Sequence, residues 1–177
     1  MNFPSFPSAL LKHFPSSLAG LVLVTCLSAC DTVTTTQYEA TALTTYTWQV
    51  EYATSLSSSK SSRFENFTST SLLNRNGIQP EMAVTGPDDR GLWWPALPPR
   101  PTVDEVEAKT QANEMARTPE LIKSVYYEIS FQANNQTQTL PTNYEVYREV
   151  VKAYPNQIPL ELVLGLNNQS VEKAEPQ

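Results

Sequence analysis

The chain has 177 residues, 18 acidic against 12 basic side chains, and a formal net charge of −6. That length suits one domain, and the shortage of Lys and Arg argues against nucleic-acid binding and against electrostatic docking on anionic lipid, since both need a basic surface. Both cysteines and the single histidine lie within the first 30 residues. Disulfide frameworks, zinc sites built on Cys or His, and Ser–His–Asp or Cys–His catalytic centres are therefore excluded from the rest of the chain, for which we expect no cofactor.

Residues 1–29 have the organisation of a secretory signal peptide. They contain Lys12 and His13 but no acidic residue, and they end with the uncharged apolar run Leu18–Ala29. Such a run is long enough for the hydrophobic part of a signal peptide and too short to span a bilayer. The alternative, a buried core helix at the start of the domain, does not explain the small residues at the end of the run.

The segment Leu27-Ser28-Ala29-Cys30 resembles the lipobox of bacterial lipoproteins, which is an aliphatic residue, two small residues and a cysteine. The resemblance implies cleavage between Ala29 and Cys30 and a diacylglyceryl group, such as one carrying palmitate, on the Cys30 thiol. Cys26 fits the pattern less well, because Thr25 stands where a small residue is needed. An ordinary signal peptide cleaved nearby is the alternative, and it would leave Cys30 as an odd free thiol.

A lipobox implies attachment to a membrane by lipid rather than by a spanning helix. Two acyl chains hold a protein on a bilayer stably, because each buried methylene contributes about 0.8 kcal/mol. We therefore expect the domain to lie on a membrane surface that faces the periplasm or the exterior, anchored through Cys30. In lipoproteins of enteric bacteria, an aspartate directly after the lipidated cysteine implies retention at the inner membrane, and Asp31 occupies that position.

The residues after the signal peptide divide into a tether, a domain and a tail. Residues 30–43 hold the lipidated cysteine and a Thr-rich segment, which we interpret as a short tether. Residues 44–166 are predicted to form a single domain. The polar residues 167–177 are predicted to form a disordered tail.

The first part of the domain is predicted to be rich in strands. Tyr46–Tyr52 alternates apolar with polar residues, which is the period of a half-buried strand. Phe64–Val84 indicates an irregular hairpin, with a turn at Asn76-Gly77 and with Pro80 confining the second arm to a sheet edge. A connector dense in proline and tryptophan follows at residues 87–101.

The second part of the domain is predicted to mix helices and strands. Thr102–Arg117 indicates a helix, because Thr102 and Glu105 have the spacing of a capping box. The remaining predicted elements, in chain order, are the strand Val125–Gln132, a turn at Asn134-Asn135, the amphipathic helix Thr142–Tyr154 and the strand Ile158–Leu166.

Together these elements predict an α+β fold, a small two-layer sandwich in which two helices cover a mostly half-exposed sheet of three to five strands. Alternating strands, rather than continuous apolar ones, indicate that the sheet is covered on one face only. If strands 125–132 and 158–166 are parallel neighbours, the helix between them makes a right-handed crossover.

The connector 87–101 carries the candidate contact residues Arg90, Trp93, Trp94 and Arg100. One interpretation is a recognition arm whose tryptophans stack on a sugar or dock in a groove of a partner, while an arginine meets an acidic group. The other is a strap that lies across the domain and completes its core, which we favour because a small domain needs its large apolar side chains. The stretch Leu92–Pro101 also resembles uncharacterised envelope proteins of cyanobacteria, which brings no activity with it.

The acidic residues give weaker indications of chemistry. Glu145 and Glu149 share a helix face, but Arg148 and Lys152 lie nearby and an ordinary solvated face explains all four. Asp88-Asp89 lacks the spacing of a calcium loop, so we expect a polar turn and no metal site.

Three hypotheses about function follow. The favoured one is a non-catalytic envelope lipoprotein that binds or scaffolds another envelope component. The alternatives are an aromatic-surface binder of a small ligand or glycan and a carboxylate-dependent hydrolase, which would need two acids facing one cleft.

Overall fold

The computed structural model describes residues 31–54 and 62–177. Eight strands form one mixed sheet in the order β1-β7-β8-β6-β5-β2-β3, and β4 pairs with β2 beside the end of β5. Only the pair β6–β8 is parallel among the described strands. The strands are β1 (Thr32–Thr35), β2 (Tyr38–Ala53), β3 (Ser62–Arg75), β4 (Met115–Ala116), β5 (Glu120–Ala133), β6 (Gln136–Thr142), β7 (Leu160–Leu164) and β8 (Val171–Pro176). The helices are α1 (Val103–Ala108), α2 (Tyr144–Ala153) and the short 3-10 turns η2 (Tyr154–Asn156) and η3 (Leu166–Asn168).

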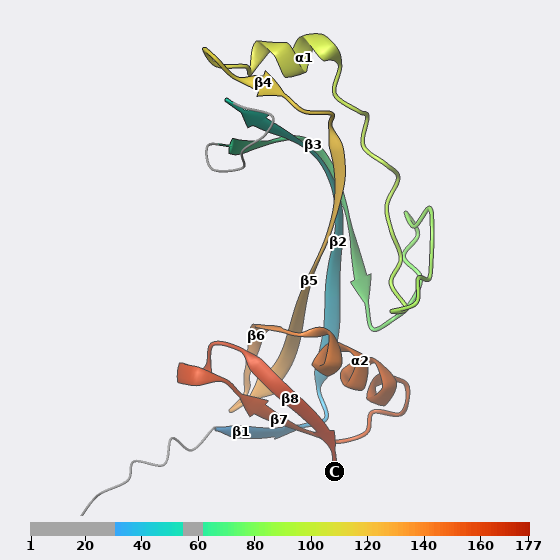
Figure 1. Ribbon diagram of the computed structural model, residues 1–177. Coiled ribbons are helices and arrows are strands. Elements are labelled where there is room, and N and C mark those ends of the chain that lie inside the picture. Colours follow the sequence, from blue (N-terminus) through green and yellow to red (C-terminus); the bar gives the residue numbers. More distant parts are fainter. Residues whose placement is uncertain (1–30, 55–61) are drawn as a thin grey trace, which may run out of the picture.

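The molecule has two parts, which Figure 1 shows one above the other. The base consists of β1, β6, β7, β8 and α2 together with the adjoining ends of β2 and β5. The blade consists of the rest of β2 and β5 together with β3, and it carries α1 and β4 at its far end, the tip. Its two faces follow the alternation along β2: the inner face contains Ala42, Thr44 and Tyr46, and the outer face contains Leu43 and Thr45.

This architecture shows that the predicted two-layer sandwich with three to five strands is wrong. The sheet has eight strands, and the two α-helices do not form a layer over it, since α2 packs in the base while α1 lies at the tip. The unpredicted strands β1, β6 and β8 are polar and lack a clear apolar alternation. Strands β6 and β8 pair with the strands that directly precede them, β5 and β7, whereas β1 pairs with the distant β7. Backbone pairing of this kind leaves no apolar period for a periodicity analysis to detect.

The base holds the larger core of the molecule. Only two residues separate β1 from β2, so the strand order from β2 through β5, β6, β8 and β7 to β1 curls back toward its own start. Helix α2 packs within this curl, and its N-terminus is capped by the Asn143 side chain, which accepts a hydrogen bond from the Val146 N–H at 3.0 Å. The most deeply buried core side chains are Ile129, Phe131, Val150, Leu160, Leu162 and Val171.

The base also corrects the predicted tether and tail. Residues 31–43, expected to be a tether, form β1 and the start of β2, and Ala40 is fully buried. Residues 167–177, expected to be disordered, contain β8, whose Val171 and Ala174 face the core. Both segments are ordered because each pairs with β7, on either side of it.

Four predicted elements of the base are confirmed. Strand β5 contains 125–132, with Tyr127, Ile129 and Phe131 buried on the predicted face. Asn134 and Asn135 form the predicted turn, both with positive φ. Helix α2 and strand β7 also lie where the sequence places them. Strands β5 and β7 are not neighbours in the sheet, however, so α2 does not make the right-handed crossover that parallel neighbouring strands would require.

The blade differs from its prediction at two elements. Strand β3 pairs with β2 along its length, so the hairpin is β2–β3 and not an arrangement within 64–84. The Asn76-Gly77 turn exists, but it leads the chain out of the sheet and against α2, where a Cβ on Gly77 would lie 2.7 Å from a Val151 methyl. The predicted helix 102–117 is only α1, although its capping box is present.

A second, small core stabilises the tip. Val50 and Tyr52 of β2 are fully buried and pack against Val106 of α1, whose carbonyl accepts a 2.8 Å hydrogen bond from the Tyr52 hydroxyl. Arg63 lies over the Tyr52 ring at 4.4 Å and forms a two-pronged ion pair with Glu114. The tip is therefore fixed to the blade by both apolar and charged contacts.

Within the described residues, no helix has the length and apolar character needed to cross a membrane.

Candidate functional site

The predicted cleavage and lipidation residues, Ala29 and Cys30, lie outside the described residues. The residue after them, Asp31, belongs to the base, where its carboxylate accepts a 2.8 Å hydrogen bond from the Asn168 side chain and its carbonyl accepts one from the Leu164 N–H. The described chain therefore begins in the base, which lies at the end of the molecule opposite α1 (Figure 1).

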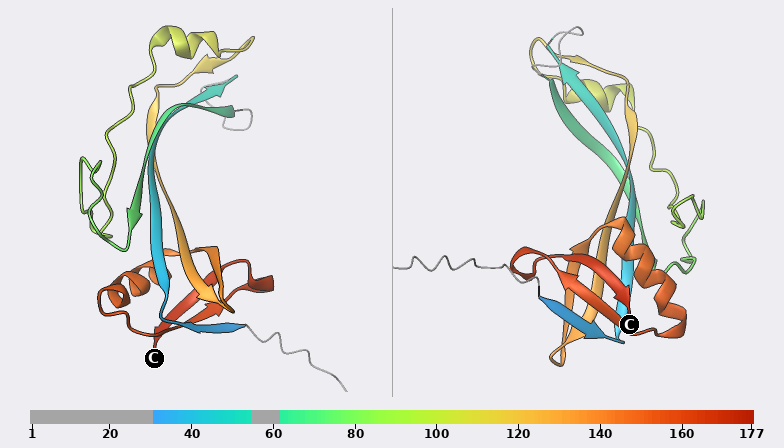
Figure 2. Two further views of the ribbon diagram at one scale, coloured as in Figure 1. Left: turned by 180° about the vertical axis from the view of Figure 1, so that it is seen from behind. Right: turned by 60° about the horizontal axis from the view of Figure 1, so that its bottom comes forward.

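The connector 87–101, which we call the strap, runs beside the blade toward α1, as the views in Figures 1 and 2 agree. Trp94 is 6% exposed and packs on Tyr46 of the inner face, with ring centroids 5.0 Å apart. Its indole N–H donates to Asp88 at 2.8 Å. The Trp93 N–H donates to the Asn74 side chain at 2.8 Å, and the Trp93 carbonyl accepts from Thr44 at 2.8 Å.

Three further side chains of the sheet hold the upper strap. The Trp48 indole donates to the Pro98 carbonyl at 3.0 Å, and the hydroxyls of Thr70 and Thr68 donate to the carbonyls of Ala96 and Pro99 at 2.6 Å each. These bonds satisfy backbone carbonyls that have no strand neighbour. The geometry therefore matches a strap across the blade rather than a free recognition arm.

The predicted contact residues Arg90 and Arg100 are also turned toward the protein's own rings. The Arg90 guanidinium lies 5.3 Å from the Tyr144 ring centroid, and that of Arg100 lies 5.4 Å from Trp48. Lys123 approaches Trp94 in the same way at 4.9 Å. Cations thus already lie over the rings of Tyr144, Trp48 and Trp94, whereas Trp93 is half-buried.

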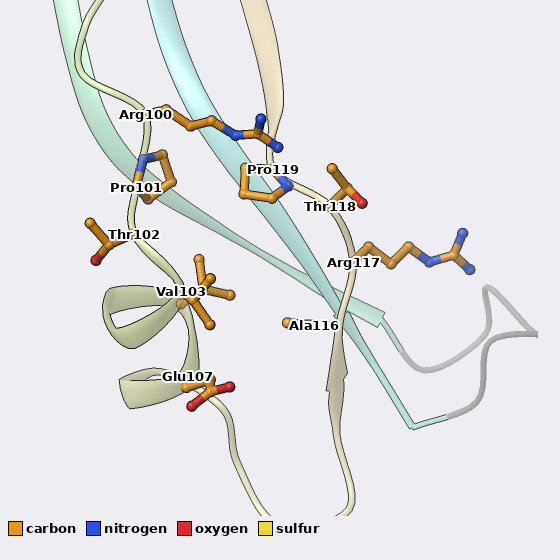
Figure 3. A pocket seen from close by; sticks show the side chains of 10 residues that line it. Arg100, Pro101, Thr102, Val103, Glu107, Ala116, Arg117, Thr118 and Pro119 are labelled. Carbon is orange, nitrogen blue, oxygen red and sulfur yellow. The ribbon is translucent and has the colours of Figure 1, made fainter.

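Arg100 also borders a cleft of about 360 Å³ between α1 and the segment 116–119 (Figure 3). Pro101, Val103 and Pro119 give this cleft apolar walls. The side chain of Arg117 points away from the cleft in Figure 3 and pairs with Glu51 at 3.2 Å. Glu107 and the hydroxyl residues Thr102 and Thr118 also line this cleft. It therefore holds a single carboxylate rather than the pair of acids that a carboxylate-dependent hydrolase needs.

The acidic candidates have structural partners. Both oxygens of Asp88 accept hydrogen bonds, from the N–H groups of Arg90 and Leu92 and from the Trp94 indole, so Asp88 stabilises the predicted polar turn. Glu149 pairs with Lys152 at 2.7 Å. In the described part of the chain, no three acids, histidines or cysteines gather as a metal site would require.

The pKa values of two carboxyl groups are lowered, which is the wrong direction for a general acid. Hydrogen bonds from Thr102 lower the pKa of Glu105, and hydrogen bonds from Arg63 lower the pKa of Glu114. A catalytic acid working near neutral pH needs its pKa raised instead.

The site with the clearest binding geometry lies at the edge of β3 and was not predicted. There the edge residues Thr70–Leu73 face the chain segments Pro80–Val84 and Pro95-Ala96 across a groove of about 680 Å³. Val84 is held by a 3.0 Å hydrogen bond from its N–H to the Trp94 carbonyl. Exposed apolar side chains border the groove: Met82 is 80% exposed, Val84 64% and Leu73 39%.

The groove also exposes backbone groups of β3. In an antiparallel ladder, hydrogen-bonded and non-hydrogen-bonded pairs alternate, and the Asn76 N–H donates to the Ala40 carbonyl at 2.8 Å. By this alternation the even-numbered residues of this part of β3 bond to β2, and the odd-numbered ones point away from it. The odd-numbered residue Arg75 follows this alternation, because its carbonyl accepts a hydrogen bond from the Ile78 N–H and not from β2.

A local signal for this site existed but was ambiguous. Met82 and Val84 are apolar residues that the sequence places in the second arm of the predicted hairpin, whereas they lie outside any strand of the structure. Nothing in the local sequence shows that β3 lies at the end of the sheet, because strand order depends on pairings between distant residues.

The chain matches no protein-family model, no curated protein and no solved structure. The functional argument therefore depends on its own residues and geometry.

Proposed function

We propose that this chain is a bacterial envelope lipoprotein, anchored through lipid on Cys30, that acts as a non-catalytic binding or scaffolding module. The observation that carries the binding role is the groove of about 680 Å³ beside the unpaired edge of β3, with exposed Met82 and Val84. Contiguous exposed apolar patches and unprotected strand edges are features that mark interaction surfaces on soluble domains.

The position of the groove suits an anchored protein. Asp31, which directly follows the proposed lipidated cysteine, belongs to the base, so a lipid on Cys30 would hold the base against the bilayer. The 16 residues of β2 span about 50 Å at roughly 3.3 Å per residue. The blade would then extend into the periplasm or the exterior, and the groove would face a partner away from the lipid headgroups. The inner membrane is the proposed site because Asp31 follows the cysteine.

The two alternative functions gain no support from the described residues. A glycan binder needs a free aromatic face, whereas Trp94 is buried and the rings of Tyr144 and Trp48 carry arginines. A carboxylate-dependent hydrolase needs two acids in one cleft with separated pKa values, whereas Asp88 is fully occupied by hydrogen bonds to its own turn.

The anchor is tested by the intact mass of the protein extracted from membranes, beside a Cys30→Ala variant. We expect the wild type to begin at Cys30 and to carry the added mass of acyl chains, and the variant to retain its signal peptide. A soluble wild type without lipid would overturn the anchor.

The binding role is tested in intact cells by a photo-crosslinking amino acid placed at position 82 or, as a control, at Arg148, an exposed position on α2. We expect a discrete crosslinked product from position 82 only. Equal products from both positions would mean that the groove has no special role.

A further inference from the structure

We infer that the groove beside β3 receives an extended, largely apolar peptide segment of another protein, which adds as a new strand to the β3 edge and places a basic residue opposite Glu81. This inference deepens the proposed binding role by naming the chemistry of the partner, and it does not depend on the lipid anchor.

The first argument comes from the backbone. By the alternation of the β2–β3 ladder, Ser69, Ser71 and Leu73 direct their N–H and C=O groups away from β2. In the described part of the chain, no backbone or side-chain group hydrogen-bonds to those outward groups. A row of alternating donors and acceptors is matched by another extended backbone, and this is how peptides add to sheet edges in known recognition modes.

The second argument is that this edge lacks the usual protection. Natural edge strands are kept short or carry charged residues, prolines or bulges that prevent pairing. The opposite end of the sheet follows this rule, since β1 has four residues. From Ser69 to Asn74, however, β3 has neither a charge nor a proline, and its register shift lies before that stretch. The hydrogen bonds between the strap and β3 use the side chains of Thr68, Thr70 and Asn74 and not the outward backbone groups of β3, so these backbone groups are left open.

The third argument concerns the walls of the groove. Met82, Val84 and the prolines at 80 and 95 are apolar, which suits apolar side chains on one face of an added strand. Glu81 is the one charged residue among those that line the groove, it is exposed, and no cation of the described chain pairs with it. In a chain with a net charge of −6, this arrangement favours a partner segment with a lysine or arginine and disfavours an acidic one.

The test uses the full-length protein in detergent and a fluorescent seven-residue peptide in which valine alternates with threonine and the central residue is lysine. Because strand addition draws its affinity from main-chain hydrogen bonds, a generic extended peptide is a fair probe. Fluorescence anisotropy measures the binding. We expect saturable binding that weakens by about tenfold when the peptide's alternate amides are N-methylated, which corresponds to about 1.4 kcal/mol.

A matched pair of variants locates the binding at the β3 edge. Ser71→Pro removes an outward N–H without removing a bond to β2, whereas Ser71→Ala removes only the hydroxyl. We expect the proline variant to bind about tenfold more weakly and the alanine variant to bind like the wild type. Met82→Asp, at a side chain that is 80% exposed, is a second variant with little risk to folding and should weaken binding similarly.

A charge exchange tests the orientation of the partner. Glu81→Lys should weaken binding of the lysine peptide and strengthen binding of the same peptide with a central glutamate. Absence of wild-type binding up to about 1 mM peptide, or equal binding by the Ser71→Pro and Met82→Asp variants, would overturn the inference. The intact-mass result on Cys30 is unaffected by either outcome, so failure of the inference is distinguishable from failure of the anchor.

Discussion

The base and the blade are built from the same two long strands but are stabilised in different ways. In the base, the lower parts of β2 and β5 bury apolar side chains such as Ala40, Ile129 and Phe131 under a curled sheet and α2. In the blade, the upper parts of the same strands are covered by a strap held through polar side chains, among them Asn74, which is fully buried. A strand can thus change from apolar packing to hydrogen-bonded coverage along its length, and the long unprotected edge of β3 lies beside the second arrangement.

The largest effect is expected from a cavity in the base. Phe131→Ala removes a side chain that is 1% exposed, and such changes cost about 3–5 kcal/mol. The free energy of unfolding, measured by urea titration and circular dichroism, should fall by that amount. Tyr126→Ala on the outer face of the same strand, where the side chain is 52% exposed, is the control and should cost less than about 1 kcal/mol. Similar losses from both variants would contradict a core confined to one face.

A smaller and local effect is expected where polar groups hold the strap. Asn74→Ala leaves the Trp93 N–H without its acceptor, and an unpaired buried donor costs about 1–3 kcal/mol. The tryptophan fluorescence should shift to longer wavelength as the strap loosens, while the circular dichroism of the base is retained. If the fluorescence is unchanged, the hydrogen bonds of Asn74 do not hold the strap.

The sequence-based predictions succeeded for elements with an apolar period and failed for elements without one. In the base, α2, β5 and β7 were predictable because their apolar periodicity reflects burial in one core. The polar strands β1, β6 and β8 were missed, since backbone pairing rather than an apolar period orders them, in β6 and β8 with the preceding strand and in β1 with the distant β7. The capping box at Thr102 was predictive of where α1 begins but not of where it ends, because no continuous apolar stripe follows Ala108.

The candidate site was predictable only in part. The sequence singled out Trp93, Trp94, Arg90 and Arg100 as unusual, and the favoured strap interpretation matches their inward contacts. The groove could not be predicted, because it depends on which strand ends the sheet and on where the chain lies after Gly77. Both are properties of the whole fold.

The stability of the base should depend on pH in the alkaline range, through the buried Tyr147 of α2. Burial raises the pKa of Tyr147 to about 12, above the value near 10 expected for an unfolded tyrosine. The neutral hydroxyl is therefore favoured in the folded state, so its contribution is complete below pH 10 and is lost as the pH rises from 10 to 12. Urea titrations at several pH values should show this loss, and it should be smaller in Tyr147→Phe.

The same variant has a further expected result at neutral pH. The Tyr147 hydroxyl is buried and lies near the Gly77 backbone, but no hydrogen bond of good geometry reaches it. Removing it should therefore change the unfolding free energy by less than about 1 kcal/mol in either direction. A loss of several kcal/mol would show that the hydroxyl is bonded in solution.

The smallest effect is expected at the tip. Glu105→Ala removes half of the capping box of α1, a solvent-exposed hydrogen bond whose loss should loosen only the first turn of this helix. Hydrogen exchange of the amides of Val103–Val106 should accelerate while β5 is unaffected. Because the hydrogen bonds from Thr102 lower the pKa of Glu105, this contribution should be present at neutral pH and lost as the pH falls through that lowered pKa. Faster exchange in the base would contradict the independence of the two parts.

The most direct test of the account is residue-resolved amide hydrogen exchange along β3, measured by NMR on the protein without a partner. An open edge predicts an alternating pattern, in which the outward amides of Ser69, Ser71 and Leu73 exchange much faster than those of Thr70, Leu72 and Asn74, which bond to β2. Uniform protection along this stretch would show that the edge is already covered, and it would contradict the proposal that the groove is where a partner strand binds.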